Sequence, residues 1–197
     1  MNPPVLAREF YQRPTDVVAR EMLGKLLIRV LPQGVVAIRL NEVEAYLGVD
    51  DPACHTYRGR RTQRTETMWG EAGHAYVYLV YGIHHCLNVV TLGPGLPEAV
   101  LIRGGEIVVG ADLVRERRGP RIAERCLVDG PGKLCQALAI DRSDDGVDLC
   151  NRSSLLRVCD DGHSVPDERV RRVSRVGVDY AGEAASWLLR LVTVSTV

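Results

Sequence analysis

The chain has 197 residues, 46% of them apolar and 25% charged, and its 25 basic and 25 acidic residues give a formal net charge of zero. These values are ordinary for a globular protein, so we expect a single domain over residues 1–197. No run of 18 apolar residues occurs, and the N-terminus lacks the basic-then-apolar plan of a signal peptide. This pattern excludes a membrane span and predicts a cytoplasmic protein.

Six cysteines are present, and no two of them have Cys-x-x-Cys spacing. In a cytoplasmic chain of this size we expect reduced, mostly buried thiols. Cys54-His55 and His84-His85-Cys86 could supply metal ligands. However, adjacent residues of a strand point to opposite faces, and the paired ligand spacing of structural zinc sites is missing. We therefore expect neither a metal nor another cofactor.

The N-terminal quarter predicts one helix and two strands. Thr15-Asp16 is expected to cap a short helix that runs to about Leu23 and ends at Gly24. Residues 26–31 form an apolar strand, and residues 32–34 form a turn. Residues 35–46 then alternate, which predicts a strand with one face made of Val36, Ile38, Leu40, Glu42, Glu44 and Tyr46. A carboxylate on a buried face must be paired, ligand-bound or catalytic, because burying it alone is costly.

Residues 47–74 predict a long loop, and such loops in compact domains are often functional. Strands at 75–80 and 85–91 follow, joined at Tyr81-Gly82, which predicts a β-hairpin with Tyr81 near its tip. Further elements are expected as a strand at 99–103, helices at 107–118 and 133–138, and a strand at 188–194. This mixture predicts an α+β fold, a single compact domain around a curved, largely antiparallel sheet with a protruding hairpin.

Aromatic and basic side chains are concentrated in one part of the chain. Six of the ten aromatic residues lie between positions 46 and 81, interleaved with four arginines at 58–64. Stacking rings combined with cations suit an extruded base and its phosphates. Further arginine clusters lie at 115–125 and 169–175. Each run alone is most simply a solvated face, and a net charge of zero is unusual for a nucleic-acid-binding protein.

Several short motifs, in order, carry a resemblance to a known family. They are EVEAYLG at 42–48 with His55 after it, RTQRT at 61–65, MW at 68–69, YVY at 76–78, YG at 81–82, CLNV at 86–89, VLIR at 100–103, GPGKLCQAL at 130–138, RVGV at 175–178 and AGE at 181–183. Over nearly its whole length the chain resembles the alkyladenine (3-methyladenine) DNA glycosylase family.

The resemblance implies a role for each matching side chain. Glu44 is expected to be the general base for the attacking water, and Arg103 to contact a DNA phosphate and hold the water and base in place. Tyr46 and Tyr78 would stack on the extruded base, and His55 would contact its edge. Binding roles are also expected for Asn88, which would clash with the 2-amino group of normal guanine, and for Tyr81, which would fill the vacated space as a wedge in the minor groove. Arg61, Arg64 and Lys133 are expected to contact DNA.

Physical chemistry supports this reaction independently. Cleavage of a glycosidic bond passes through an oxocarbenium-like sugar, which a nearby carboxylate stabilises while it deprotonates water. N-alkylated purines carry positive charge and leave easily, whereas hypoxanthine needs protonation by an acid that the sequence does not identify. We therefore expect a monomeric, monofunctional enzyme that flips damaged purines such as 3-methyladenine, 7-methylguanine or hypoxanthine out of double-stranded DNA.

Three alternatives stay open. A non-catalytic nucleic-acid-binding relative on the same fold would not need Glu44 at all. A lyase that forms a Schiff base would need Lys25 or Lys133, the only two lysines, and neither lies in the aromatic-rich segment. A metal-dependent hydrolase would lose its activity in chelator.

Overall fold

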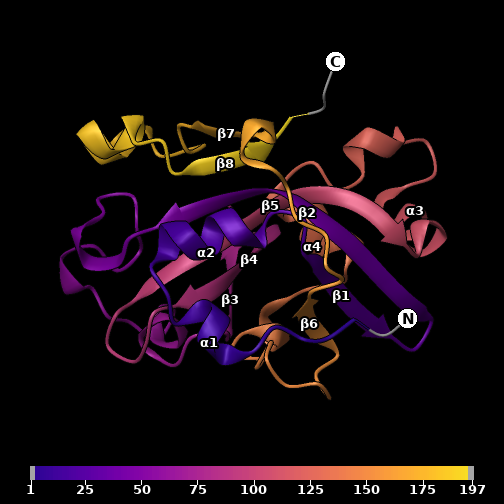
Figure 1. Ribbon diagram of the computed structural model, residues 1–197, viewed down its shortest axis with the longest axis horizontal. Helices are drawn as coiled ribbons and strands as arrows, with labels where there is room; N and C mark the ends of the chain where they lie inside the picture. The colour runs from indigo at the N-terminus through magenta and orange to yellow at the C-terminus, as the bar shows by residue number, and fades with distance from the viewer. Residues whose placement is uncertain (1–2, 195–197) are drawn as a thin grey trace.

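The computed structural model describes residues 3–194 and has one curled antiparallel sheet at its centre (Figure 1). The order of hydrogen-bonded strands is β3-β4-β5-β2-β1-β6; β8 pairs with β2, and β7 pairs with β8. The strands are β1 Leu26–Leu31, β2 Gly34–Tyr46, β3 Ala75–Val80, β4 His84–Thr91, β5 Glu98–Val109, β6 Leu156–Cys159, β7 Val170–Val173 and β8 Arg190–Thr193. The predicted α+β class with an antiparallel sheet is confirmed.

Helices cover the sheet and complete the core. They are α1 Arg8–Tyr11, α2 Thr15–Met22, α3 Ala111–Arg118 and α4 Pro131–Ala137. Apolar side chains of α2 and of α4 join the inward-facing residues of the strands in one main cluster of buried residues. The predicted loop at 47–74 contains three short 3-10 helices, Gly48–Asp50, Tyr57–Gly59 and Glu66–Trp69, but no strand or α-helix.

The elements predicted from local pattern agree with the structure, with corrections at their ends. The strands at 26–31 and 75–80 have the predicted bounds. The helix begins at Thr15, but its N-cap residue is Pro14 and no side chain caps it. The Thr15 hydroxyl instead lies 2.6 Å from that of Thr91. The prediction that Thr15-Asp16 caps the helix is therefore wrong, because Thr15 is already inside the helix and its hydroxyl has a tertiary partner.

The region around Gly110 also differs from the prediction. The predicted short strand at 99–103 extends over Glu98–Val109, and the helix begins only at Ala111. Gly110 has a φ of +82°, and a Cβ atom there would lie 2.5 Å from the carbonyl oxygen of Val35. This left-handed glycine ends the strand, so residues 107–109 pair in the sheet instead of joining the helix.

A bulge in β2 changes which face its side chains occupy. Register shifts interrupt the pairing of β2 with β5 on both sides of Glu42. Before the bulge the even-numbered residues of β2 face the core, namely Val36, Ile38 and Leu40. After it the odd-numbered residues Val43 and Ala45 do so. Glu44 and Tyr46 share a face, as expected, but that face is not the one occupied by Leu40. The predicted unbroken alternation is wrong, because one extra residue in a strand reverses the facing of all residues after it.

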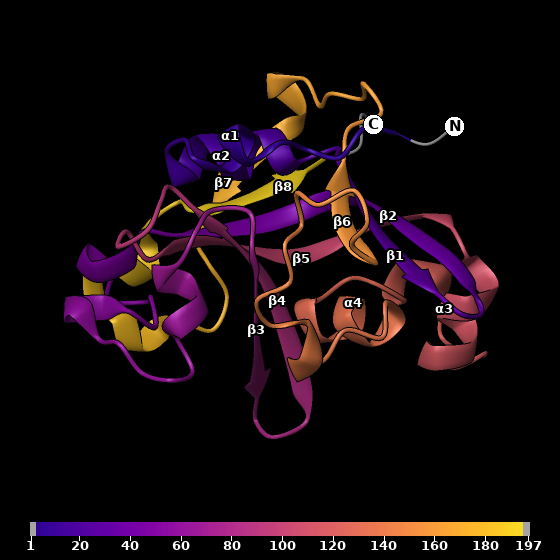
Figure 2. The ribbon, with the colours of Figure 1, turned by 90° about the horizontal axis from the view of Figure 1, so that it is seen from below.

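The predicted hairpin is confirmed and projects from the body of the protein. Figure 2 shows β3 and β4 extending away from the rest of the sheet, with α4 beside them. Tyr81 lies in the turn with a φ of +53°, and its side chain is exposed, with 90% of the residue's surface accessible. The hairpin therefore presents an uncovered aromatic ring at its tip.

Residues 3–194 contain no helix that combines the length and apolar character needed to cross a membrane. In the same residues, no three His, Cys, Asp or Glu side chains come together as a set able to hold a metal ion. All six cysteines are free thiols, and four of them are buried: Cys54, Cys86, Cys135 and Cys159.

Candidate active site

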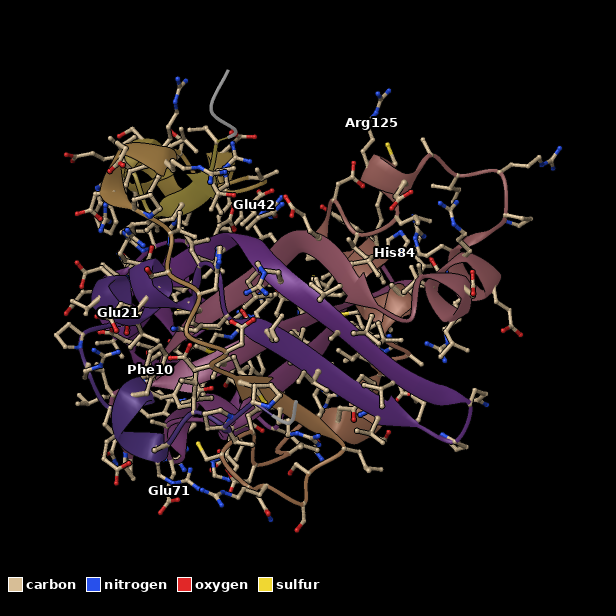
Figure 3. All side chains as sticks on the ribbon, turned by 45° about the vertical axis from the view of Figure 1, so that its right-hand side comes forward. Phe10, Glu21, Glu42, Glu71, His84 and Arg125 are labelled. Carbon is tan, nitrogen blue, oxygen red and sulfur yellow. The ribbon has the colours of Figure 1, made fainter. Side chains whose placement is uncertain are left out.

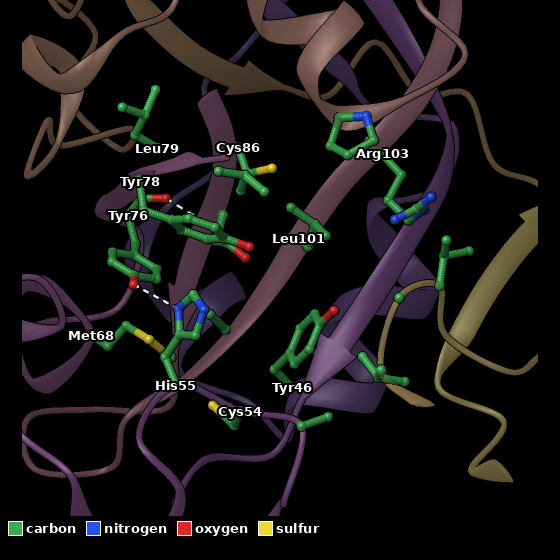
Figure 4. Close-up of a pocket in the computed structure, with 18 of the residues that line it drawn as sticks. Tyr46, Cys54, His55, Met68, Tyr76, Tyr78, Leu79, Cys86, Leu101 and Arg103 are labelled. Carbon is green, nitrogen blue, oxygen red and sulfur yellow. Dashed lines mark hydrogen bonds between the residues drawn. The ribbon is translucent and has the colours of Figure 1, made fainter. Parts of the chain in front are cut away.

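A cavity of about 580 Å³ opens beside the base of the hairpin, and side chains from distant parts of the chain line it (Figure 4). Strand β2 contributes Tyr46, and the segment 47–74 contributes Cys54, His55, Arg64 and Met68. The remaining walls come from β3, β4, β5, the residue Pro131 and the segment 176–180. The pairing of β3 with β4, of β4 with β5 and of β5 with β2 is what brings these walls together.

Aromatic rings form one wall of the cavity. The ring of His55 lies edge-on to that of Tyr78, with 4.6 Å between ring centres, and Tyr76 and Tyr78 are 5.3 Å apart. His55 Nδ1 lies 2.9 Å from the hydroxyl of Tyr76. In Figure 4, Tyr46 lies across the cavity from the His55–Tyr78 group. Aromatic side chains therefore line two sides of the cavity.

His55 is held in its neutral form. Burial lowers its pKa to about 4, and the nearby cations of Arg64 and Arg60 act in the same direction. A neutral imidazole has one donor and one acceptor nitrogen, and Nδ1 is already engaged by Tyr76. Nε2 is then left for the edge of a ligand, so His55 serves as a hydrogen-bonding group rather than as an acid at neutral pH.

Glu44 lies behind the cavity wall and is fully enclosed, with 0% of its surface exposed. The hydroxyl of Tyr46 donates to Oε2 at 2.8 Å, and the backbone N–H of Val176 donates to Oε1 at 2.8 Å. Nη1 of Arg103 lies 3.4 Å from Oε1. Tyr46, Val176 and Arg103 all line the cavity, whereas Glu44 itself does not.

The environment of Glu44 makes it a stronger base than an ordinary carboxylate. Burial raises its pKa, and this effect exceeds the opposing effects of Arg103, the Val176 N–H and the Tyr46 hydroxyl. Burial likewise raises the pKa of Tyr46 far above its usual range, so its hydroxyl keeps its proton and remains a donor. A carboxylate with raised pKa, charged partners and a cavity beside it is typical of a catalytic acid or base.

Asn88 and Arg64 also line the cavity, and the roles predicted for them stay predictions. The amide of Asn88 is buried and donates to the backbone carbonyl of Tyr76 at 3.1 Å, which fixes its orientation. The guanidinium carbon of Arg64 lies 4.9 Å from the centre of the Tyr78 ring. Arg64 therefore covers one side of the aromatic wall instead of projecting freely into solvent.

The structure does not bring Arg61 and Lys133 into the cavity lining. Arg61 donates to Glu66 at 2.9 Å and lies over the Trp69 ring, while Lys133 is 2.8 Å from Asp129. Both are surface side chains with surface partners. Their expected contacts with DNA remain predictions.

Sequence reasoning missed two partners of the buried carboxylate system. Val176 holds Glu44 through its backbone N–H, and Glu42 accepts from Nε of Arg103 at 2.7 Å. Val176 lies in the RVGV motif and Glu42 in EVEAYLG, so both positions were marked, but neither had a role. A backbone donor 132 residues away from its acceptor leaves no signal in side-chain chemistry.

The fold and the site together define a class of protein: an α+β domain with an aromatic-lined cavity next to an enclosed carboxylate and an arginine, and with an exposed tyrosine on a hairpin at the cavity mouth. The chain belongs to the methylpurine-DNA glycosylase family, whose model matches residues 9–195. The resemblance found in the sequence motifs is therefore confirmed.

Relatives in several organisms are similar along almost the whole chain, and each carries the name "Putative 3-methyladenine DNA glycosylase". The protein of Methanocella arvoryzae is 48% identical over 182 residues, covering 92% of this chain and 88% of the relative. The protein of Bdellovibrio bacteriovorus is 45% identical, and the match covers 94% of this chain and 93% of the relative. That of Desulfitobacterium hafniense is 44% identical, with 92% and 91% covered.

Proposed function

We propose that this protein is a DNA glycosylase that hydrolyses the N-glycosidic bond of alkylated purines in double-stranded DNA. The observation that carries the proposal is the enclosed Glu44, held between Arg103 and the Tyr46 hydroxyl directly behind an aromatic cavity. Such an arrangement costs stability, because it withdraws a carboxylate from water, and it is typical of a site where that carboxylate acts chemically.

Binding requires that the damaged nucleotide leave the duplex. The cavity lies in the body of the protein while Tyr81 projects from the hairpin beside it, and Tyr81 also lines the cavity mouth. Tyr81 enters the space that the base vacates, and the base stacks between Tyr46 and Tyr78 with its edge towards His55. Stacking on an aromatic ring contributes roughly 1–3 kcal/mol per base, which offsets much of the few kcal/mol that extrusion costs.

The chemistry is a single displacement by water. A water molecule between Glu44 and Arg103 transfers a proton to Glu44 while its oxygen bonds to C1′ of the deoxyribose. The bond from C1′ to the purine nitrogen breaks, and its electron pair leaves with the base. Each carboxylate oxygen has two acceptor positions, so both can hold a water in addition to their present donors. The negative charge of Glu44 also stabilises the developing oxocarbenium ion.

The charge state of His55 bears on how fast different damaged bases are released. A purine alkylated at N3 or N7 is already cationic and needs no acid, whereas neutral hypoxanthine does. Because His55 has a pKa of about 4, it has no proton to give at neutral pH. We infer that cationic methylated purines such as 3-methyladenine and 7-methylguanine are released faster than hypoxanthine.

The positions of the lysines support hydrolysis without a Schiff base. Lys25 is largely buried and lies 2.8 Å from Asp160, and Lys133 lies 2.8 Å from Asp129. Neither lines the cavity. We therefore infer that the enzyme is monofunctional and forms no Schiff base; its action as a monomer stays a prediction.

The test is release of free base from two duplexes, one containing 7-methylguanine and one containing hypoxanthine. We expect release from both, faster from the first, and its loss by at least about a hundredfold in Glu44→Gln, the usual scale of base catalysis. Borohydride should trap no covalent adduct with DNA, and chelator should not reduce the rate. Normal release by Glu44→Gln would overturn the catalytic assignment. Specific binding without any release would identify a non-catalytic relative.

A further inference from the structure

Four charged side chains form an alternating row that ends at Glu44. The row runs from Arg190 on β8 to Glu42 on β2, then to Arg103 on β5 and finally to Glu44. Arg190 Nη1 lies 3.2 Å from Glu42 Oε1, which also accepts from Arg103 Nε at 2.7 Å. Figure 3 labels Glu42 where the C-terminal strands meet the long strands β2 and β5.

The bulge in β2 determines the face of the strand on which this row lies. Glu42 lies opposite Gly104 of β5 and opposite Val192 of β8, with register shifts on both sides of it in the β5 pairing. A Cβ atom at Gly104 would lie 3.7 Å from that of Glu42 and 3.3 Å from the Asn41 side chain. Glu42 and Glu44, two residues apart, therefore share a strand face that Leu40 does not occupy, and both reach Arg103.

Glu42 itself does not reach the cavity. Arg103 lines the cavity with its side chain 12% exposed, while Glu42 is 20% exposed and absent from the lining residues. Glu42 can therefore act on the reaction only indirectly, by holding Arg103 and by the effect of its charge on Glu44. Its bond to Nε fixes the plane of the guanidinium, and this leaves the terminal nitrogens for Glu44 and for whatever enters the cavity.

We propose that Glu42 is a positioning residue: it fixes the Arg103 guanidinium against Glu44, and Arg190 holds Glu42 in that place. The proposal rests on the role proposed above for Glu44 as the base. It gives a function to Glu42 and Arg190, two side chains that contact neither the base nor the attacking water. Without Glu42, Arg103 is free to swing towards a DNA phosphate and away from the carboxylate.

The row also sets the charge that Glu44 experiences. The titratable and charged groups that face Glu44 are Glu42 and Tyr46 of β2, Cys86 of β4, Arg103 of β5, and Arg175 of the C-terminal segment. The negative charge of Glu42 raises the pKa of Glu44, while Arg103 lowers it. Removing Glu42's charge while Arg103 keeps its place should lower that pKa, because like charges disfavour ionisation. Removing Arg190's charge should raise it, because opposite charges favour ionisation.

The experiment measures single-turnover rates against pH on a duplex with one 7-methylguanine. Because this base is already cationic, the acid limb of the profile reports the ionisation of the general base. We expect Glu42→Gln, whose amide oxygen can still accept from Arg103 Nε, to move that limb to lower pH and Arg190→Met to move it to higher pH, each by about half a unit. Glu42→Asp should keep the limb near its original position, and Glu42→Ala should lower the plateau rate about tenfold with little change in DNA affinity.

A merely structural role would reduce the amount of active enzyme and leave the limb in place. The proposal would be overturned if the acid limb stayed in place in both Glu42→Gln and Arg190→Met, or if it moved in the same direction in both. A wild-type profile without an acid limb would also overturn it. Glu44→Gln is assayed beside them. If that variant retains base release, Glu44 is not the general base. This result distinguishes a failure of the proposed function from a failure of the role proposed for Glu42.

Discussion

Arg175 and Asp51 form a fully buried ion pair 124 residues apart in the sequence, with both side chains 0% exposed. Arg175 Nη2 donates to Asp51 Oδ1 at 2.8 Å, and Nη1 donates to Oδ2 and to the carbonyl of Ala45. The guanidinium also lies 4.8 Å from the centre of the Tyr46 ring. The pair therefore joins β2, the segment 47–74 and the C-terminal segment, which are three of the cavity walls.

Replacing Asp51 by Asn should destabilise the protein strongly, because the guanidinium of Arg175 would remain buried without its counter-charge. The expected loss in free energy of unfolding is about 3–5 kcal/mol, measured by urea titration. The matched control is Asp144→Asn, which breaks the Arg29–Asp144 pair away from the cavity. Both variants should lose stability, but only Asp51→Asn should lower the rate of base release per folded molecule. Equal specific activity in the two variants would refute the link between this pair and the site.

The local parts of the fold were predictable from sequence. The strand at 75–80 and the hairpin with Tyr81 at its tip follow from β-branched and aromatic residues on either side of Tyr81-Gly82. The end of β5 was not predictable, because it depends on backbone approach across the sheet. A Cβ atom at Gly110 would lie 2.5 Å from the carbonyl oxygen of Val35, and no pattern in residues 99–110 contains that information.

In the candidate site, too, some features were predictable from the sequence and others were not. Glu44 and Tyr46 were placed on one face by their spacing, and the structure joins them by a hydrogen bond of 2.8 Å. The roles of Glu42 and Val176 depend on the bulge in β2 and on a contact between distant segments, which side-chain chemistry alone does not encode. The resemblance to a family marked both positions without explaining either.

His55 should make the protein less stable in mild acid. Its pKa is about 4 in the folded protein, chiefly because of burial, against about 6.5 in an unfolded chain. The unfolded state therefore binds more protons between these values, so the free energy of unfolding falls as pH is lowered from about 6.5 towards 4. His55→Gln should remove part of this fall in urea titrations. Arg64→Gln should reduce it, because Arg64 also lowers the pKa of His55. An unchanged slope in His55→Gln would contradict the burial of this imidazole.

Tyr81 offers a test that separates DNA binding from folding. Its φ of +53° is unfavourable for a residue with a Cβ atom and costs on the order of 1–2 kcal/mol. Tyr81→Gly relieves this strain and leaves the exposed tip without a ring, so the thermal midpoint should stay the same or rise. Extrusion of the lesion, followed with a fluorescent base analogue, should nevertheless fall about tenfold, the equivalent of about 1.4 kcal/mol of lost stacking. Unchanged extrusion would show that Tyr81 is not a wedge.

Asn88 should exclude normal guanine through its fixed position in the cavity. Its side chain is buried and bonded to the Tyr76 carbonyl, so it cannot turn aside when a 2-amino group approaches. Asn88→Ala should therefore release unmodified guanine from a G·T mismatch at least about tenfold faster, because removing a steric clash of about 1.4 kcal/mol changes a rate by that factor. The control is Cys86→Ala, which also removes a cavity-lining side chain of β4 but leaves Asn88 in place. Release of guanine by Cys86→Ala to the same extent would mean that cavity size, and not the Asn88 amide, excludes the normal base.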